Sequence, residues 1–281
     1  KSHSVNDDLP HENAWAVCES PDGSVWVGTD GGLARRTAGR WESWKTEQGL
    51  SRNNIRALAV DREGTVWIGT GEGLNSLRDG KVTRHPIPGD WFEAKIRVIL
   101  PTRDGALWVA GAASLHRLSA GDRTKFTTAE GLANNDVRAL LEDAAGRLWI
   151  GTFGGGLQCY EGGRFTTYST TNGLASGFVW ALHQDAEGSL WIGTESGLHR
   201  LRAGRITAFG KAQGLPDNLV NFILEDDLGQ LWISHDRGIY RVSRAALDDV
   251  AEGRTNMVRC VSYTKADGLP SEETNGQKSY P

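Results

Sequence analysis

The stretch Gly146-Arg147-Leu148-Trp149-Ile150-Gly151-Thr152 decides the fold, because the sequence contains six copies of this pattern, including this one. The copies are centred on Trp26, Trp67, Trp108, Trp149, Trp191 and Trp232, at spacings of 41, 41, 41, 42 and 41 residues. A fixed period of about forty residues, with one tryptophan strand in each, is typical of a β-propeller. The sequence therefore predicts an all-β chain with one four-stranded antiparallel blade per repeat.

Each repeat reads as four short strands, called a to d in chain order, separated by tight turns. In the second copy they are an apolar strand at 55–60, the tryptophan strand at 66–70, and two further strands at 73–77 and 81–86. Gly and Asp fill the turns between them, as hairpins require. Burial of one indole contributes about 2–3 kcal/mol, so the six tryptophans are predicted to form packed layers between blades rather than a binding ladder.

The composition of the chain argues against some classes of function. The 281 residues carry a net charge of −4 with scattered Lys and Arg, which argues against nucleic acid and against direct membrane contact. No apolar run reaches the roughly 18 residues that span a bilayer. Cys18, Cys159 and Cys260 occupy different repeat positions and suggest free thiols. Because repeat arrays do not follow ordinary domain lengths, residues 1–281 are interpreted as a single propeller domain.

The combined pattern is Gly-Leu, Asn, an apolar strand, Asp, Gly, Leu-Trp-Ile-Gly-Thr and Gly-Leu, and it resembles the two-component regulator propeller repeat. The match is clearest at 131–157, good at 49–74, 173–198 and 214–239, recognisable at 9–33 and decayed at 88–115. The resemblance implies a periplasmic sensor region of a histidine kinase or hybrid regulator, built as a seven-bladed propeller. It also implies downstream signalling domains in the parent chain.

The number of blades stays open at the sequence level. Six repeats are complete, and residues 267–281 open a seventh that stops before a seventh tryptophan. Residues 1–8 align with the end of an outer strand. We therefore expect a fragment of a seven-bladed ring; the alternative is a six-bladed ring with extra tails.

Two repeats depart from the pattern, and departures on a repeat scaffold often carry function. The third repeat has Trp91 and Phe92 in its entry loop instead of Gly-Leu. The sixth has His235 and Asp236 where others have Thr and a turn residue, and it carries an insertion at 243–256 that reads as a short helix closed by Gly253. Neutral drift of individual repeats is the alternative.

One register position is polar or aromatic although its neighbours are apolar. Eleven residues before the core tryptophans stand Trp15, Arg56, Arg97, Arg138, Trp180 and Asn221. Guanidinium groups and indoles near the hub would suit a glycan-derived, possibly anionic, small molecule or oligosaccharide, at the end of the blades where the b–c turns and d–a loops meet. The b–c turns add further side chains at this end: Asp30, Glu72, Phe153, Glu195, His235 and Asp236. Alternatively, these arginines pair with turn carboxylates such as Asp136 or Glu142.

No catalytic motif, metal-ligand spacing or cofactor signature is found, so the chain is predicted to be a non-catalytic sensor without metal or cofactor. Exposed aromatic residues fit a second hypothesis, a protein–protein interaction scaffold. A propeller lyase or hydrolase using His235, Asp236 and Glu195 is a third. A homodimer is compatible with the sensor hypothesis.

Overall fold

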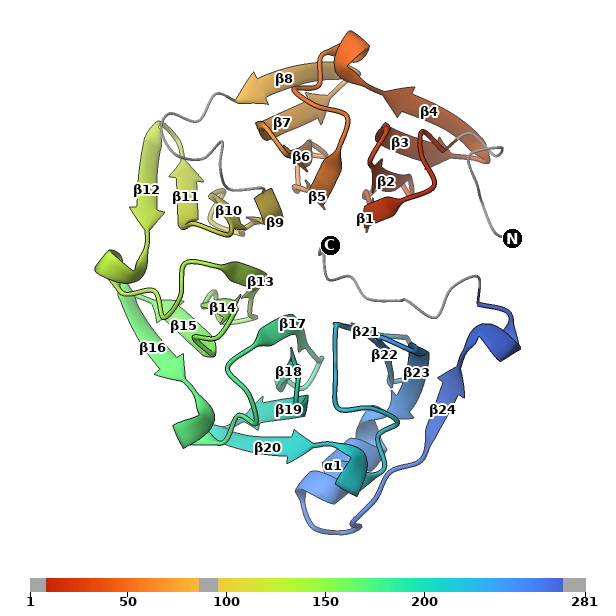
Figure 1. Ribbon diagram of the computed structural model, residues 1–281. Helices are drawn as coiled ribbons and strands as arrows, with labels where there is room; N and C mark the ends of the chain where they lie inside the picture. Colours follow the sequence, from red (N-terminus) through yellow and green to blue (C-terminus); the bar gives the residue numbers. More distant parts are fainter. Residues whose placement is uncertain (1–8, 86–95, 270–281) are drawn as a thin grey trace. The chain divides into compact units, whose positions relative to one another are not determined.

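The computed structural model describes residues 9–85 and 96–269 of the chain, which form six four-stranded antiparallel sheets (Figure 1). Each sheet is one propeller blade, and its strands a to d follow one another in sequence and in space. The predicted all-β class with four-stranded blades is confirmed. Trp91, Phe92 and the seventh repeat beyond Leu269 lie outside the described residues. The chain divides into two compact units, with the boundary between Val137 and Arg138.

The first unit contains blades 1 to 3, whose first strands lie side by side in the order β1, β5, β9. The strands are β1 (Ala14–Glu19), β2 (Val25–Thr29), β3 (Gly32–Thr37) and β4 (Arg40–Trp44); β5 (Ile55–Val60), β6 (Val66–Thr70), β7 (Gly73–Arg78) and β8 (Lys81–His85); and β9 (Ile96–Pro101), β10 (Leu107–Gly111), β11 (Leu115–Ser119) and β12 (Asp122–Phe126).

The second unit contains blades 4 to 6. The strands are β13 (Val137–Glu142), β14 (Leu148–Thr152), β15 (Leu157–Glu161) and β16 (Arg164–Tyr168); β17 (Val179–Gln184), β18 (Leu190–Thr194), β19 (Gly197–Arg202) and β20 (Arg205–Phe209); and β21 (Phe222–Glu225), β22 (Gln230–His235), β23 (Gly238–Ser243) and β24 (Cys260–Tyr263). An eight-residue helix, α1 (Arg244–Ala251), lies between β23 and β24. None of the helices in the described residues has the length and apolarity needed to span a bilayer.

The core tryptophans make the same two contacts in most blades. In blades 2, 4, 5 and 6 the indole nitrogen donates to the first Asp of the a–b turn, as Trp191 does to Asp185 at 2.8 Å. In every blade the indole also packs on a ring near the end of strand d, with centroids 5.1–5.9 Å apart: Trp44, His85, Phe126, Tyr168, Phe209 and Tyr263. The tryptophan therefore joins the second and fourth strands of its blade, which is a structural role.

The glycine after Trp-Ile is fixed by the approach of the next blade. A Cβ on Gly193 would lie 2.6 Å from Cγ1 of Val220 and 2.9 Å from the Val220 carbonyl oxygen. The same close approach joins Gly69 to Ile96 at 2.5 Å. The motif glycine thus leaves room for the side chain of the next blade's first strand, and at Gly193 also for its backbone.

The Gly-Leu loop is a 3₁₀ turn with a left-handed glycine cap. Residues 9–85 and 96–269 contain five such turns: η2 (Thr46–Gln48), η4 (Thr128–Glu130), η5 (Thr170–Asn172), η6 (Lys211–Gln213) and η7 (Lys265–Asp267). In η2, Gly49 adopts a φ of 108°, and the following Leu50 is fully buried. The motif asparagine, Asn53, accepts a hydrogen bond from the Thr46 amide at 2.8 Å. The family-like residues therefore build the scaffold.

A second device links this loop to strand c of the same blade. The amide after the leucine donates to a buried side chain 24 residues later: Ser51 to Asn75 at 3.0 Å, and Ala175 to Nε2 of His199 at 2.8 Å. In blades 1 and 6 the loop residue is Pro10 or Pro216, which has no N–H, and the residue 24 positions later is Ala34 or Tyr240. The two blades that lack the loop amide therefore also lack the asparagine or histidine that would accept its hydrogen bond.

Helix α1 is held on its blade by apolar contacts and ion pairs. Leu247 is fully buried in the core shared with blade 6. Arg244, the first helical residue, donates to Glu225 at 2.8 Å and to Glu187 of blade 5 at 2.9 Å. Asp248 pairs with the buried Arg200 of β19. The helix therefore covers one side of blades 5 and 6.

Candidate functional site

In four blades the polar register position before the core tryptophan coincides with a β-bulge. Strand pairing skips Trp15 in β1, Arg56 in β5, Arg97 in β9 and Trp180 in β17, each of which is the extra residue opposite strand b. A bulge turns the extra side chain out of the alternating pattern of its strand. This explains why these positions are unlike their apolar neighbours.

In the first unit the bulge residues of blades 1 and 2 lie together. The Arg56 guanidinium lies 4.1 Å from the centroid of the Trp15 ring and 3.0 Å from the carboxylate of Asp30 in the b–c turn of blade 1. Asp30 also accepts a hydrogen bond from Asn13 at 3.2 Å. Arg56 is therefore already bound to an anion of the protein itself.

The other two arginines are also engaged. Arg97 lies 3.4 Å from the carboxylate of Asp136, which is the pairing that the alternative interpretation of the sequence predicts. In the second unit the buried Arg138 guanidinium lies 4.7 Å from the Phe153 ring centroid and 5.3 Å from that of Trp180. None of the three presents a guanidinium free of a protein partner.

Phe153 stands in the b–c turn of blade 4, as the sequence predicts, and the structure adds its aromatic partner Phe178. This turn is one residue longer than the others and contains Gly154 and Gly156 with φ of 101° and 83°. The Phe153 side chain is 39% exposed, and Phe178 meets it edge-on with centroids 4.6 Å apart. Trp180 lies 5.5 Å away. The signal in the sequence was the single spacing of 42 residues between Trp149 and Trp191.

In blade 6 the structure brings Asn221, His235 and Asp236 together at the same end of the sheet. Asn221 is fully buried and donates to Asp236 at 3.1 Å. Nδ1 of His235 lies 3.9 Å from Asp217, which also pairs with Arg237 at 2.7 Å. Burial lowers the pKa of His235, and Arg237 adds to this effect while Asp217 opposes it. The neutral imidazole is therefore favoured.

A polar cavity of about 380 Å³ opens at this end of blades 1 and 2. It is lined by Asp30, Thr46, Ser51, Arg52, Asn53, Asn54 and Glu72. Arg52 and Glu72 form an ion pair, and Asp30 pairs with Arg56. Apart from these balanced charges, the lining offers amides and hydroxyls.

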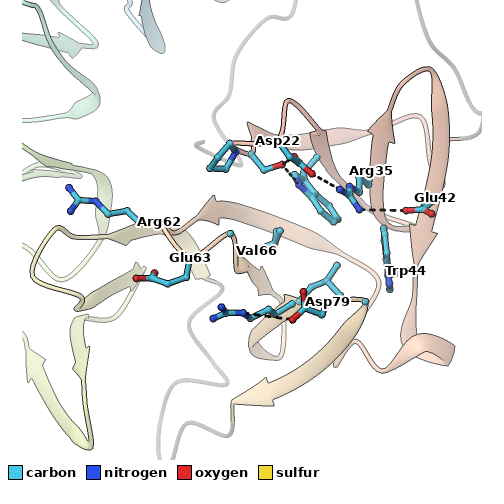
Figure 2. Close-up of a pocket in the computed structure, with 15 residues that line it drawn as sticks. Asp22, Arg35, Glu42, Trp44, Arg62, Glu63, Val66 and Asp79 are labelled. Carbon is cyan, nitrogen blue, oxygen red and sulfur yellow. Dashed lines mark hydrogen bonds and ion pairs between the residues drawn. The ribbon is translucent and has the colours of Figure 1, made fainter.

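A larger groove of about 610 Å³ lies at the opposite end of blades 1 and 2 (Figure 2). Trp26, Trp44, Val66 and Leu77 form its apolar part. Arg35 is held by Asp22 at 2.7 Å and lies 3.9 Å from Glu42. Hydrogen bonds from Ser20 and Ser24 lower the pKa of Asp22 well below its usual range.

The ion pair between Arg35 and Asp22 is not specific to this groove. Blade 3 repeats it as Arg117 with Asp104, also at 2.7 Å. In both blades a hydroxyl residue, Ser20 or Thr102, stands where other blades have the turn Asp, and it donates to the displaced carboxylate. The pair therefore closes the a–b turn.

No group of three or more His, Cys, Asp or Glu side chains in residues 9–85 and 96–269 is arranged to hold a metal ion. Within the same ranges, Cys18, Cys159 and Cys260 are free thiols. Burial raises the pKa of Cys18 to about 12 and that of Cys260 to about 11. These thiols are therefore protonated and poor nucleophiles at neutral pH.

Comparison with protein families identifies the repeats. The sequence profile described as "Two component regulator propeller" matches residues 8–31, 49–72, 131–154 and 173–196. The resemblance drawn from the sequence is confirmed. The repeat at 214–239 is not among the matched stretches, although the structure builds a blade there. A search of curated protein sequences returned no match.

Solved structures share the fold at low sequence identity. The extracellular domain of a hybrid two-component system from B. thetaiotaomicron is 23% identical with a TM-score of 0.79, over 95% of this chain and 36% of that one. A second such domain from the same species is 20% identical with a TM-score of 0.56, over 91% and 44%. Virginiamycin B lyase from Staphylococcus aureus is 13% identical with a TM-score of 0.71, over 89% and 84%. The chain thus spans about a third of the length of the first of these structures.

Proposed function

Because the chain carries the two-component regulator propeller repeat, we propose that it is the non-catalytic, ligand-sensing propeller of a bacterial two-component signalling protein. Its ligand is a glycan-derived small molecule that binds at the end of the blades formed by b–c turns and d–a loops. The parent protein holds this propeller in the periplasm and carries the signalling domains. Similarity to extracellular domains of two-component systems supports this location.

The observation that carries the proposal is the set of bulges at one register position. Polar or aromatic side chains occur there, at Trp15, Arg56, Arg97 and Trp180, although the residues on either side of each are apolar. Bulges are over-represented beside functional sites because they redirect a side chain. The polar cavity of about 380 Å³ opens at the same end of blades 1 and 2.

A thermal-shift screen of the purified chain against neutral and acidic oligosaccharides tests this function. A ligand that binds only the folded protein raises the melting temperature in proportion to the logarithm of its concentration. A saturable increase with one class of oligosaccharide is expected. No shift with any sugar at millimolar concentration would contradict the sensor assignment.

Substitution of bulge residues is expected to weaken ligand binding without unfolding the protein. Arg97→Ala removes the partner of Asp136, and Trp180→Ala removes an aromatic wall; each should reduce affinity by about tenfold or more, since about 1.4 kcal/mol is involved. Isothermal titration with the oligosaccharide found in the screen measures the loss. Arg117→Ala is the matched control, because Arg117 is ion-paired in the same blade as Arg97 but at the opposite end. Equal effects of Arg97→Ala and Arg117→Ala would argue against the site.

An interaction scaffold is the second candidate function, and the groove of Figure 2 favours it. Its apolar part is surrounded by exposed charged residues such as Glu42 and Asp79. An apolar centre with a polar rim is typical of protein contact surfaces. Loss of a protein partner on substitution of Trp44, with oligosaccharide binding intact, would assign this groove to the second function.

We propose that a seventh blade packs on the face of blade 6 that carries Leu224 and Val261. Leu224 and Val261, on strands a and d of that blade, are 55% and 48% exposed, whereas Ala59 of blade 2, at the position of Leu224, packs against blade 3. The cap η7 with Gly268 repeats the device found before other blades. We expect Leu224→Ser to change the free energy of unfolding of this chain by less than about 0.5 kcal/mol, as for an exposed residue.

The same substitution should cost about 1–2 kcal/mol in a chain extended by one further repeat, because Leu224 would then be buried. Urea denaturation of both chains, with and without Leu224→Ser, measures the difference. An equal effect in the two chains would contradict a seventh blade on this face.

A further inference from the structure

We infer that the ligand of this propeller is an uncharged, polyhydroxylated ring that stacks on Phe153 at the end of blades 4 and 5. The inference rests on the proposed function and narrows its ligand class. It centres the site on Phe153 and Glu195, adds Phe178 to it, and excludes the acidic sugars that the arginines alone would suggest.

The first argument is the state of the arginines. Arg56 lies 3.0 Å from Asp30 and Arg97 lies 3.4 Å from Asp136, so an acidic ligand would have to displace a carboxylate of the protein. Arg138 is buried between two aromatic rings. A guanidinium already paired at such distances contributes little to binding a second anion. The arginines therefore position neighbouring groups rather than neutralise a ligand.

The second argument is the aromatic surface, which we call the Phe153 platform: Phe153, Phe178 and Trp180. Phe153 is exposed, and Phe178 and Trp180 support it edge-on at 4.6 and 5.5 Å. The turn that carries Phe153 is fixed by two backbone hydrogen bonds, from Gly154 and Gly156 to the Gly177 carbonyl, at 3.0 and 2.9 Å. A supported, exposed ring of this kind offers a rigid face to the C–H side of a sugar ring.

The third argument is the charge beside the platform. The exposed carboxylate of Glu195 accepts a hydrogen bond from Ser176 at 3.2 Å, and the Glu195 amide donates to the Phe178 carbonyl at 3.3 Å. A carboxylate here accepts hydrogen bonds from sugar hydroxyls but repels a uronate or sulfate. Next to it, the buried indole nitrogen of Trp180 has no hydrogen-bond acceptor among the described residues. The site thus offers a carboxylate acceptor to hydroxyl groups, and its cation, the Arg138 guanidinium, is stacked on the Phe153 and Trp180 rings.

The test pairs neutral oligosaccharides of glucose, galactose and xylose with the uronic acid oligosaccharides of the same ring and linkage. Affinity is measured by isothermal titration at low and high salt, for the unmodified chain, Phe153→Ala and Phe165→Ala. Phe165, on the outer strand β16 of the same blade, is the matched control. We expect a neutral sugar to bind with little salt dependence, and at least a tenfold loss of affinity in Phe153→Ala only.

Three results would overturn the inference. Stronger, salt-sensitive binding of a uronic acid oligosaccharide would refute the neutral class and leave the sensor function standing. Neutral binding that survives Phe153→Ala would refute the platform. Absence of binding by every sugar of both series would contradict the proposed function itself, and with it this inference.

Discussion

Gly193→Val is expected to destabilise the protein by about 3 kcal/mol or more. The first added carbon would meet Cγ1 of Val220 at 2.6 Å and the Val220 carbonyl oxygen at 2.9 Å. A contact with backbone cannot be relieved by a change of rotamer, so strand a of blade 6 would have to move away from blade 5. Overpacking in a core commonly costs 1–3 kcal/mol, and a backbone clash lies at the upper end. Urea denaturation followed by tryptophan fluorescence measures the change.

Blade 3 supplies the control for this prediction. It has a buried alanine, Ala110, at the position where blades 1, 2, 4 and 5 have the motif glycine. Ala110→Gly should therefore cost no more than about 1 kcal/mol, from chain flexibility and one lost methyl group. If Gly193→Val and Ala110→Gly had similar effects, close approach of the blades would not be the reason for the glycine.

The second large effect concerns acid stability and His199. Burial lowers the pKa of this fully buried imidazole from 6.5 to about 4. Because the folded pKa is lower than the unfolded one, its contribution is fully present above about pH 6.5 and is lost as the pH falls toward 4. The free energy of unfolding should decrease by about 3 kcal/mol over this window on account of His199 alone. Denaturation curves at several pH values between 4 and 7 measure it.

Blade 2 shows how to remove the titration and keep the hydrogen bond. There Asn75 accepts from the Ser51 amide and donates to the Ser51 hydroxyl, which also contacts Thr70. The double variant Ala175→Ser, His199→Asn transfers this arrangement to blade 5. Between pH 6.5 and pH 4, we expect the free energy of unfolding of this variant to decrease by about 3 kcal/mol less than that of the unmodified protein. An unchanged pH dependence would assign the acid sensitivity to other groups.

Most of the scaffold could be predicted from the sequence because each blade depends on local and periodic signals. The spacing of the tryptophans and the Gly-Leu loops predicted strands and turns, since a hairpin and a glycine cap require particular residues at particular positions. The family resemblance followed from the same residues. The seventh repeat, whose first residues were recognised, stays a prediction.

The site was harder to predict because it depends on bulges and on contacts between blades. The sequence marked Trp180 as unlike its strand, but not that strand pairing skips it. The sequence allowed the arginines either to bind a ligand or to pair with a turn carboxylate. Only the folded chain shows that Arg97 lies beside Asp136. The sequence put Phe153 in a b–c turn, but only the folded chain shows Phe178 beside it, because the two residues belong to different blades.

The pairing of each entry loop with strand c restricts how blades can be recombined. A chimaera that joins the Pro216 loop to a strand carrying histidine or asparagine would bury an acceptor with no donor. The reverse junction, an Ala175-type loop with Tyr240, would leave a backbone amide unpaired, at a cost of about 1–3 kcal/mol. Crossover points that keep the 24-residue segment from loop to strand c intact avoid both. The unit of exchange along this chain is therefore the loop with its following three strands, and not the sheet of four strands seen in space.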